Sequence, residues 1–133
     1  MEIQSLIFLY AVILFSAVIH EYFHAWTADT LGDPTARRAG RLTINPLAHM
    51  DLYGTVILPL LMMSFFKIFI GYAKPVPFNP YNIKYKHGTL LVGIAGPAAN
   101  MLIAIVFGVV LRLFFTASPL GPLLALIVYI NIF

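Results

Sequence analysis

Two histidines and a glutamate stand close together near the end of the first apolar stretch of this chain, as His20-Glu21-Tyr22-Phe23-His24. On a helix, residues four apart share a face, so both imidazoles could reach one metal ion. Zinc binds imidazole nitrogens at about 2.0–2.1 Å, and a catalytic zinc site keeps one position open for water. Glu21 could take a proton from that water and pass it to a leaving amine. The spacing therefore predicts one Zn²⁺ ion held by His20 and His24, with Glu21 as general base.

The location of these three side chains supports a metal site. They directly follow an apolar run, Ile3–Ile19, that is long enough to lie in a bilayer. A charged side chain deep in a membrane helix costs roughly 2.5–3.5 kcal/mol on lenient insertion scales. Structural zinc sites in small peptides bind with about 10–16 kcal/mol, so metal ligation can outweigh the cost of burial. The alternative is that the side chains snorkel to the interface at the helix end, which for a single histidine is the simpler interpretation.

The composition indicates that the surrounding elements are membrane helices. Of the 133 residues, 61% are hydrophobic and only 10% are charged, which is too apolar for a soluble globule of this size. Three apolar runs are each near the ~20 residues that a helix needs to cross the hydrocarbon layer: Ile3–Ile19, Thr55–Ala73 and Thr89–Leu111. A fourth run, 119–133, has too few residues to cross fully. We therefore predict an all-α, multi-pass integral membrane protein, a single domain over residues 1–133 with about four transmembrane helices, the last incomplete.

Charge and cysteine content exclude two other kinds of function. The chain contains no cysteine, so disulfides and thiolate metal sites are excluded and soft-metal chemistry would depend on histidine. The formal net charge is only +3, and the basic side chains gather in the loops that follow the first two apolar runs. Basic residues at membrane edges favour contact with anionic lipid. We expect the lipid bilayer, and no nucleic acid, as a partner.

The third apolar run carries small residues at helical spacing. In the stretch GIAGPAAN, residues 93–100, Ala95 and Ala99 are four apart, and so are Gly96 and Asn100. Small side chains on one helix face allow a neighbouring helix to approach closely in lipid. We therefore expect this run to pack tightly against another membrane helix.

Four stretches of the chain together resemble the site-2 protease family. They are HEYFH, LGDPTARRAGRLTINPLAHMD, GYAKPVPFNP and GIAGPAAN, and they occur in the family's order along nearly the whole chain. The similarity is greatest to the compact prokaryotic branch of these intramembrane zinc metalloproteases. It implies a polytopic enzyme of a prokaryotic cell membrane that hydrolyses peptide bonds in or near transmembrane segments of other membrane proteins. It also implies His20 and His24 as zinc ligands and Glu21 as the catalytic base.

The chain departs from the family's pattern in one respect. The family's third zinc ligand is an aspartate in an L-D-G motif on a later transmembrane segment, and no L-D-G occurs here. We expect the sequence to be an N-terminal fragment whose third ligand lies beyond Phe133, rather than a chain in which His49 or Asp51 substitutes. The isolated 133-residue chain would then be inactive.

Four polar residues outside the H-E-x-x-H motif are further candidates for binding substrate or lining the site: Asn45, His49, Asp51 and Asn100. Asn100 matches the asparagine of the family's G-P-x-x-N motif, which implies a hydrogen bond to the scissile carbonyl or to a strand of substrate. An interhelical hydrogen bond, worth about 0.6 kcal/mol in lipid, explains Asn100 equally well. His49 and Asp51 could line the entrance or orient the metal ligands, and a solvated loop rich in turn-forming residues is an equal alternative.

The polar loop between the first two runs contains one segment with the pattern of a strand. Arg41–Ile44 alternates polar and apolar residues with a β-branched bias, which predicts a short β element. A helical substrate must be unwound before its carbonyl can be attacked. The predicted strand could offer an edge to which such an extended substrate adds.

Three other functions fit the sequence less well than proteolysis. An inactive membrane scaffold that binds a client protein is the alternative, because the third zinc ligand is missing, although a scaffold has no use for Glu21. A desaturase-type di-iron site needs several histidine clusters, and this chain has four histidines in total. Two histidines four apart on one helix cannot lie on opposite faces of one haem. Zinc-dependent proteolysis is the function that the sequence favours.

Overall fold

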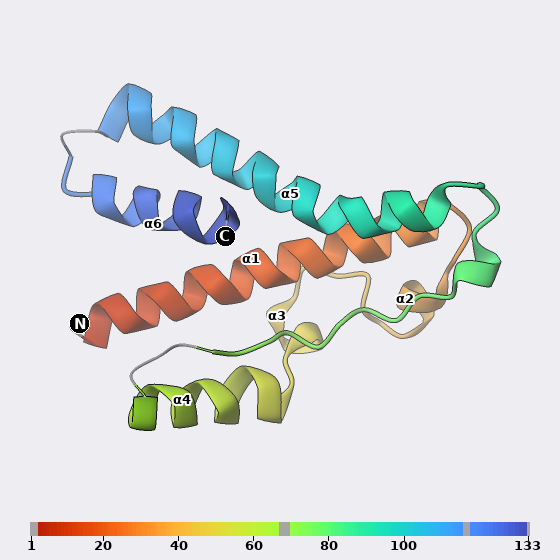
Figure 1. Ribbon diagram of the computed structural model, residues 1–133, viewed down its shortest axis with the longest axis horizontal. Helices are drawn as coiled ribbons and strands as arrows, with labels where there is room; N and C mark the ends of the chain where they lie inside the picture. The colour runs from red at the N-terminus through yellow and green to blue at the C-terminus, as the bar shows by residue number, and fades with distance from the viewer. Residues whose placement is uncertain (1–2, 67–69, 116–117, 133) are drawn as a thin grey trace.

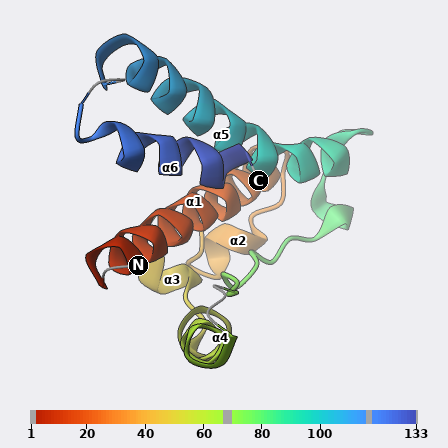
Figure 2. The same ribbon diagram turned by 60° about the vertical axis from the view of Figure 1, so that its left-hand side comes forward.

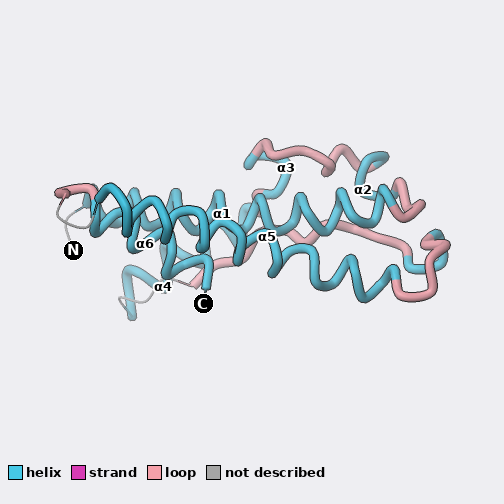
Figure 3. The backbone as a smooth tube through the Cα atoms, turned by 90° about the horizontal axis from the view of Figure 1, so that it is seen from above, coloured by secondary structure: helices cyan, strands magenta, loops and turns pink. Residues whose placement is uncertain are grey.

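The computed structural model describes residues 3–66, 70–115 and 118–132, and within these ranges the chain is helical and contains no strand (Figures 1 and 3). The elements in chain order are α1 (Ile3–Thr30), α2 (Thr35–Arg38), α3 (Pro46–His49), the π-helical turn η1 (Leu52–Ile57), α4 (Leu58–Phe66), the 3₁₀ turn η2 (Pro80–Asn82), α5 (Gly88–Val110), the π-helical turn η3 (Leu111–Phe115) and α6 (Gly121–Ile132). The all-α prediction is confirmed for the described residues.

Two helices have the length and the apolar composition needed to cross a membrane. They are Gln4–Thr30, within α1, and Gly88–Phe115, which joins α5 to η3. The apolar helices Leu52–Phe66 and Gly121–Ile132 are shorter. Within the described part of the chain, two of the expected transmembrane helices are thus long enough to cross a membrane, and the other two apolar helices are shorter.

The long helix α1 ends where the sequence supplies a residue for a left-handed turn. Gly32 has φ +109°, a conformation that side chains other than glycine's disfavour. Its N–H donates to the Asp29 carbonyl at 3.2 Å, and the Asp33 N–H donates to the Ala28 carbonyl at 2.9 Å. These two bonds form a Schellman cap. The helix therefore runs to Thr30, beyond the end of the apolar run at Ile19, and carries the HEYFH stretch in its last turns.

Helices α5 and α6 pack on α1, and the first part of α5 lies against the second half of α1 (Figures 1 and 2). Several of the buried residues along the helices are small, among them Ala25 and Ala28 on α1 and Gly96 and Ala99 on α5. Short side chains let the two backbones approach closely, as the spacing in GIAGPAAN predicted. This close contact positions the HEYFH motif against α5.

The second predicted span, Thr55–Ala73, is only partly helical. Helix α4 ends at Phe66, residues 67–69 lie outside the described residues, and from Ile70 the chain is extended. A Cβ added at Gly71 would lie 2.6 Å from Pro59 Cγ, so the chain turns back along the helix it has just left. The prediction failed here because the backbone of the returning segment binds residues of the preceding loop, as described below.

A proline near the start of α4 changes the hydrogen bonding of that helix. Pro59 has no N–H, so the Thr55 carbonyl four residues earlier lacks its usual helical donor. The Tyr10 hydroxyl of α1 donates to this carbonyl at 3.0 Å instead. The freed carbonyl thereby ties the start of the shorter helix to α1.

The β element predicted at Arg41–Ile44 does not form. These residues make a bend without a partner strand in the described structure. The Thr43 hydroxyl accepts a hydrogen bond from the Asn45 N–H at 3.1 Å, and the Thr43 carbonyl accepts one from His49 Nε2 at 2.7 Å. Local side-chain bonds therefore occupy the groups that a strand ladder would use. The hypothesis that substrate adds to this edge loses its structural basis.

The turn after α1 is held by one buried carboxylate. Asp33 is fully buried, and its oxygens accept hydrogen bonds from the Thr35 N–H at 3.2 Å, the Asn79 N–H at 2.6 Å and Asn82 Nδ2 at 2.8 Å. Burial raises the pKa of Asp33, but the hydrogen bonds from Asn82, Thr35 and Asn79 together outweigh it and lower the pKa. This residue joins the end of α1 to the segment that precedes α5.

We expect Asp33→Asn to destabilise the protein in a pH-dependent way. The pKa is lower in the folded state, so the carboxylate stabilises the fold above the unfolded pKa of about 3.9 and ceases to do so as pH falls through the folded pKa. Losing hydrogen bonds to a charged group costs about 1.5–3 kcal/mol. Thermal unfolding followed by circular dichroism in detergent should show a lower Tm for the variant at pH 7. A Tm difference of the same size below pH 3 would contradict this account.

Candidate metal centre

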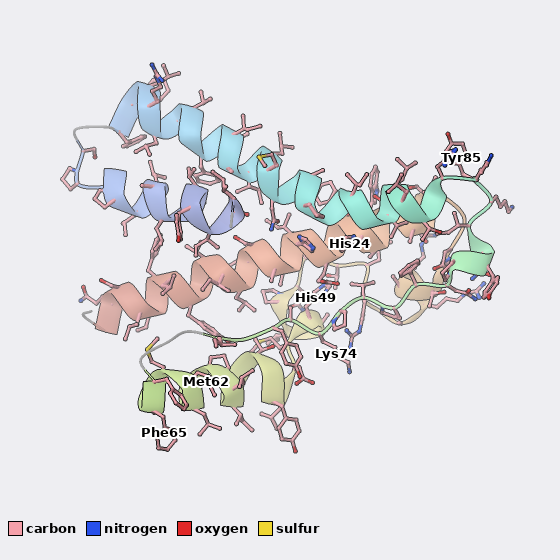
Figure 4. The ribbon with its side chains drawn as sticks, viewed as in Figure 1. His24, His49, Met62, Phe65, Lys74 and Tyr85 are labelled. Atoms are coloured by element: carbon pink, nitrogen blue, oxygen red, sulfur yellow. The ribbon has the colours of Figure 1, made fainter. Side chains whose placement is uncertain are left out.

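His20 and His24 lie side by side on α1 where this helix meets α5. Their ring centroids are 4.6 Å apart, and the ring planes are nearly perpendicular, at 80°. Figure 4 shows His24 at the crossing of the two helices. Residues four apart on α1 thus place both imidazoles on the face that α5 covers.

The backbone of α5 sets the tautomer of His24. The Nδ1 atom lies 2.6 Å from the Val92 carbonyl oxygen, and since a carbonyl can only accept, Nδ1 must carry the proton and donate. In the neutral ring, Nε2 then has a free lone pair, the form in which imidazole binds a metal. Pro97, which cannot donate to the Gly93 carbonyl, loosens the helical bonding of α5 just after this point.

Gly96 of α5 lies directly against both imidazoles. A Cβ atom added there would be 2.4 Å from His24 Nε2 and 2.6 Å from His20 Nε2. The two Nε2 atoms therefore converge on one place beside α5. Any side chain at position 96 would occupy that place.

Glu21 faces a different element from the two histidines. Its Oε2 atom accepts a hydrogen bond from the Val76 N–H at 2.8 Å. With His20 it lines a cavity of about 340 Å³, whose other lining residues come from α1, from residues 72 and 73, and from α5 and α6. The imidazole of His20 and the carboxylate of Glu21 therefore line the same cavity.

Asn100 lines the same cavity from α5. Its Oδ1 atom is buried and has no hydrogen-bond partner among the described protein atoms. A buried amide oxygen without a donor is costly, so this atom is suited to accept a hydrogen bond from a bound group. The structure thus brings Asn100 together with His20 and Glu21.

The three other candidates, all in the loop after α1, have local roles. Asn45 caps α3 by accepting a hydrogen bond from the Leu47 N–H at 3.1 Å. Asp51 caps η1 by accepting from the Tyr53 and Gly54 N–H groups at 3.0 and 2.8 Å. His49 is fully buried at the end of α3 beside α1, and its Nδ1 atom has no partner among the described residues (Figure 4). None of the three lines the cavity that contains His20 and Glu21.

Curated proteins with similar sequences were found in two bacteria. The chain is 37% identical over 100 residues to "Putative zinc metalloprotease YwhC" of Bacillus subtilis (strain 168), covering 74% of this chain and 42% of the relative. It is 34% identical over 93 residues to "Putative zinc metalloprotease Rip2" of Mycolicibacterium smegmatis, covering 69% of this chain and 35% of the relative. The chain belongs to the site-2 protease family. No protein-family model matches it, and no solved structure matches it.

The match covers less than half of each relative's own length. It spans about two fifths of YwhC and about one third of Rip2. Within the described residues, no group of three or more His, Cys, Asp or Glu side chains could hold a metal ion. The site-2 protease chain thus presents two imidazoles with converging Nε2 atoms, and neither His49 nor Asp51 joins them as a third ligand.

One polar contact beside the site was not predicted. Asn131 on α6 is buried, and its Nδ2 atom donates to the Ser16 hydroxyl at 2.9 Å and to the Ile127 carbonyl at 2.9 Å. Ser16 lies one turn before His20 and lines the same cavity. The partner of Ser16 lies 115 positions away in the sequence, so the local pattern around the motif does not indicate this contact. An asparagine within an otherwise apolar helix was the available signal for this contact.

Proposed function

We propose that this member of the site-2 protease family is a zinc metalloendopeptidase that cuts peptide bonds in or near transmembrane segments of other membrane proteins, in a prokaryotic cell membrane. One observation carries the proposal. The Nε2 atoms of His20 and His24 converge beside Gly96 of α5, and Glu21 lines a cavity together with His20. All three side chains lie on α1, which is long and apolar enough to span a bilayer. The names of the two relatives support the metalloprotease class.

Four polar side chains, those of His20, His24, Glu21 and Asn100, have a proposed part in hydrolysis. His20 and His24 would hold one Zn²⁺, and the Val92 carbonyl would keep His24 in the ligating tautomer. When bound, zinc supplies a water whose pKa is near 7. Glu21 would take the proton of the attacking water and deliver it to the leaving amine. Asn100 would hydrogen-bond the peptide group of the substrate within the cavity.

A zinc site with only two protein ligands is incomplete, since catalytic zinc usually has three. We place the third ligand of the proposed site outside the described residues, because no third His, Cys, Asp or Glu joins the pair there. The same observation favours the second candidate function, an inactive membrane scaffold. Glu21 favours the protease over the scaffold, because a scaffold needs no general base.

We expect cleavage to depend on zinc. The full-length product of the gene would be reconstituted in liposomes with a panel of tagged proteins that each have one transmembrane helix. A zinc chelator should stop cleavage, and added Zn²⁺ should restore it whereas Mg²⁺ should not, because imidazole ligands suit zinc and oxygen ligands suit magnesium. Cleavage that persists with the chelator would contradict a zinc enzyme. A complete lack of cleavage across the panel would favour the scaffold.

A further inference from the structure

An extended segment between α4 and α5, residues 71–79, runs beside α1 and past the site (Figures 1 and 4). We call these residues the strap. Two of its residues, Tyr72 and Ala73, line the cavity that contains His20 and Glu21. The strap therefore forms one wall of the proposed active site, and its backbone contacts decide how that wall is held.

Four backbone N–H groups of the strap donate to neighbouring elements. Those of Tyr72 and Lys74 donate to the Gly54 and His49 carbonyls at 3.0 and 2.9 Å. The remaining two donate to carboxylates of α1 and of the turn that follows it. Val76 donates to Glu21 Oε2 at 2.8 Å, and Asn79 donates to Asp33 Oδ2 at 2.6 Å.

The prolines of the strap explain why three of these donor residues are held in an extended conformation. Lys74, Val76 and Asn79 each precede a proline, as the sequence KPVPFNP shows. A residue before proline is biased toward the extended conformation, in which the N–H groups of residues two apart point to the same side. The prolines have no N–H of their own. The sequence thus presets the Lys74 and Val76 donors before any contact forms.

We propose that the Val76 N–H is a positioning donor for the catalytic base. It binds one carboxylate oxygen of Glu21 and fixes the side chain so that the other oxygen can meet the attacking water. This inference rests on the proposed function, in which Glu21 is the base. It adds the strap as the element that orients the base, through a backbone group 55 residues away in sequence.

Val76→Pro removes the donor, and Val76→Ala keeps it while shortening the side chain. With the full-length protein and the tagged single-helix substrates, we expect Val76→Pro to lower kcat about 100-fold, because a small misplacement of a catalytic group can cost that much. KM and bound zinc should be unchanged, and Val76→Ala should stay close to the unmodified protein. Lys74→Pro is the matched control, because it removes the neighbouring strap bond to His49 without touching Glu21.

Two kinetic results would overturn the proposal. One is a Val76→Pro enzyme whose kcat is within threefold of the unmodified protein. The other is a Lys74→Pro enzyme that loses as much kcat as Val76→Pro, which would mean that the strap acts only as general support.

Hydrogen exchange gives a second readout that does not need activity. In the unmodified protein, the Val76 amide should exchange slowly. Glu21→Ala should speed that exchange by about tenfold or more, because local opening then breaks no bond to the carboxylate, while the Lys74 amide stays slow. If Glu21→Ala left the exchange rate of the Val76 amide unchanged, the hydrogen bond between Val76 and Glu21 would be contradicted. If the unmodified protein cuts no substrate while exchange behaves as expected, the base-positioning role falls together with the proposed proteolysis, and the contact alone remains.

Discussion

Glu21→Gln is expected to abolish proteolysis while leaving zinc in place. Glutamine is nearly the same shape as glutamate, and its carbonyl oxygen can still accept the Val76 N–H that now donates to Glu21 at 2.8 Å. The glutamine side chain, however, cannot take a proton from water. General-base catalysis contributes about 10²–10⁴-fold, so we expect kcat to fall by a factor in this range. The measurement is cleavage of the tagged single-helix substrates, with zinc content determined on the same preparation.

The matched comparison for this variant is His24→Ala, which should lose zinc as well as activity. The pair separates the two roles, because only the histidine variant removes a metal ligand. A Glu21→Gln protein that retains more than a tenth of the activity would show that the base is another group. A Glu21→Gln protein that lost its zinc would show that Glu21 is itself a ligand.

Gly96→Ala is expected to disrupt the metal centre with a small effect on the fold. The added methyl group would lie 2.4 Å from His24 Nε2 and 2.6 Å from His20 Nε2, closer than atoms can approach. The two rings can rotate away, but that movement separates the nitrogens that must meet on one ion. Losses of 10–100-fold in metal affinity follow when the groups that orient ligands are changed, and we expect a loss of about that size here.

Gly93→Ala is the control, because it makes the same change on the same helix at a position where a Cβ meets no atom within 4 Å. Zinc affinity would be measured by competition with a chromogenic chelator, and stability by thermal unfolding. The Gly93 variant should match the unmodified protein in both. If the Gly96 variant bound zinc as tightly as the Gly93 variant, the two imidazoles would not share an ion at this place.

The features that the sequence predicts well are those that depend on neighbours along the chain. The H-E-x-x-H spacing fixes a common helix face for His20 and His24 regardless of the rest of the fold. The length and apolarity of the runs around α1 and α5 predict the two long helices. Glycine at position 96 predicted a close helix approach because of its size alone, although the sequence does not show that the imidazoles are its partners.

The features that could not be predicted depend on contacts between distant segments. The Val76 N–H meets Glu21 across 55 positions, and Asn131 meets Ser16 across 115. These long-range contacts, rather than local preference, therefore decide how the wall of the cavity is built.

The strand expected at Arg41–Ile44 failed for a local reason. It rested on an alternation of only four residues, and short-range hydrogen bonds of the Thr43 side chain and carbonyl outweighed that weak pattern.

The central claim is that His20 and His24 together bind one zinc ion, and X-ray absorption at the zinc edge tests it most directly. On the full-length protein purified with its metal, we expect one zinc per chain with two imidazole nitrogens at about 2.0–2.1 Å. The same spectrum of the His24→Ala protein, reloaded with zinc, should show one imidazole at most. A zinc ion without imidazole ligands, or a spectrum that His24→Ala leaves unchanged, would contradict the account.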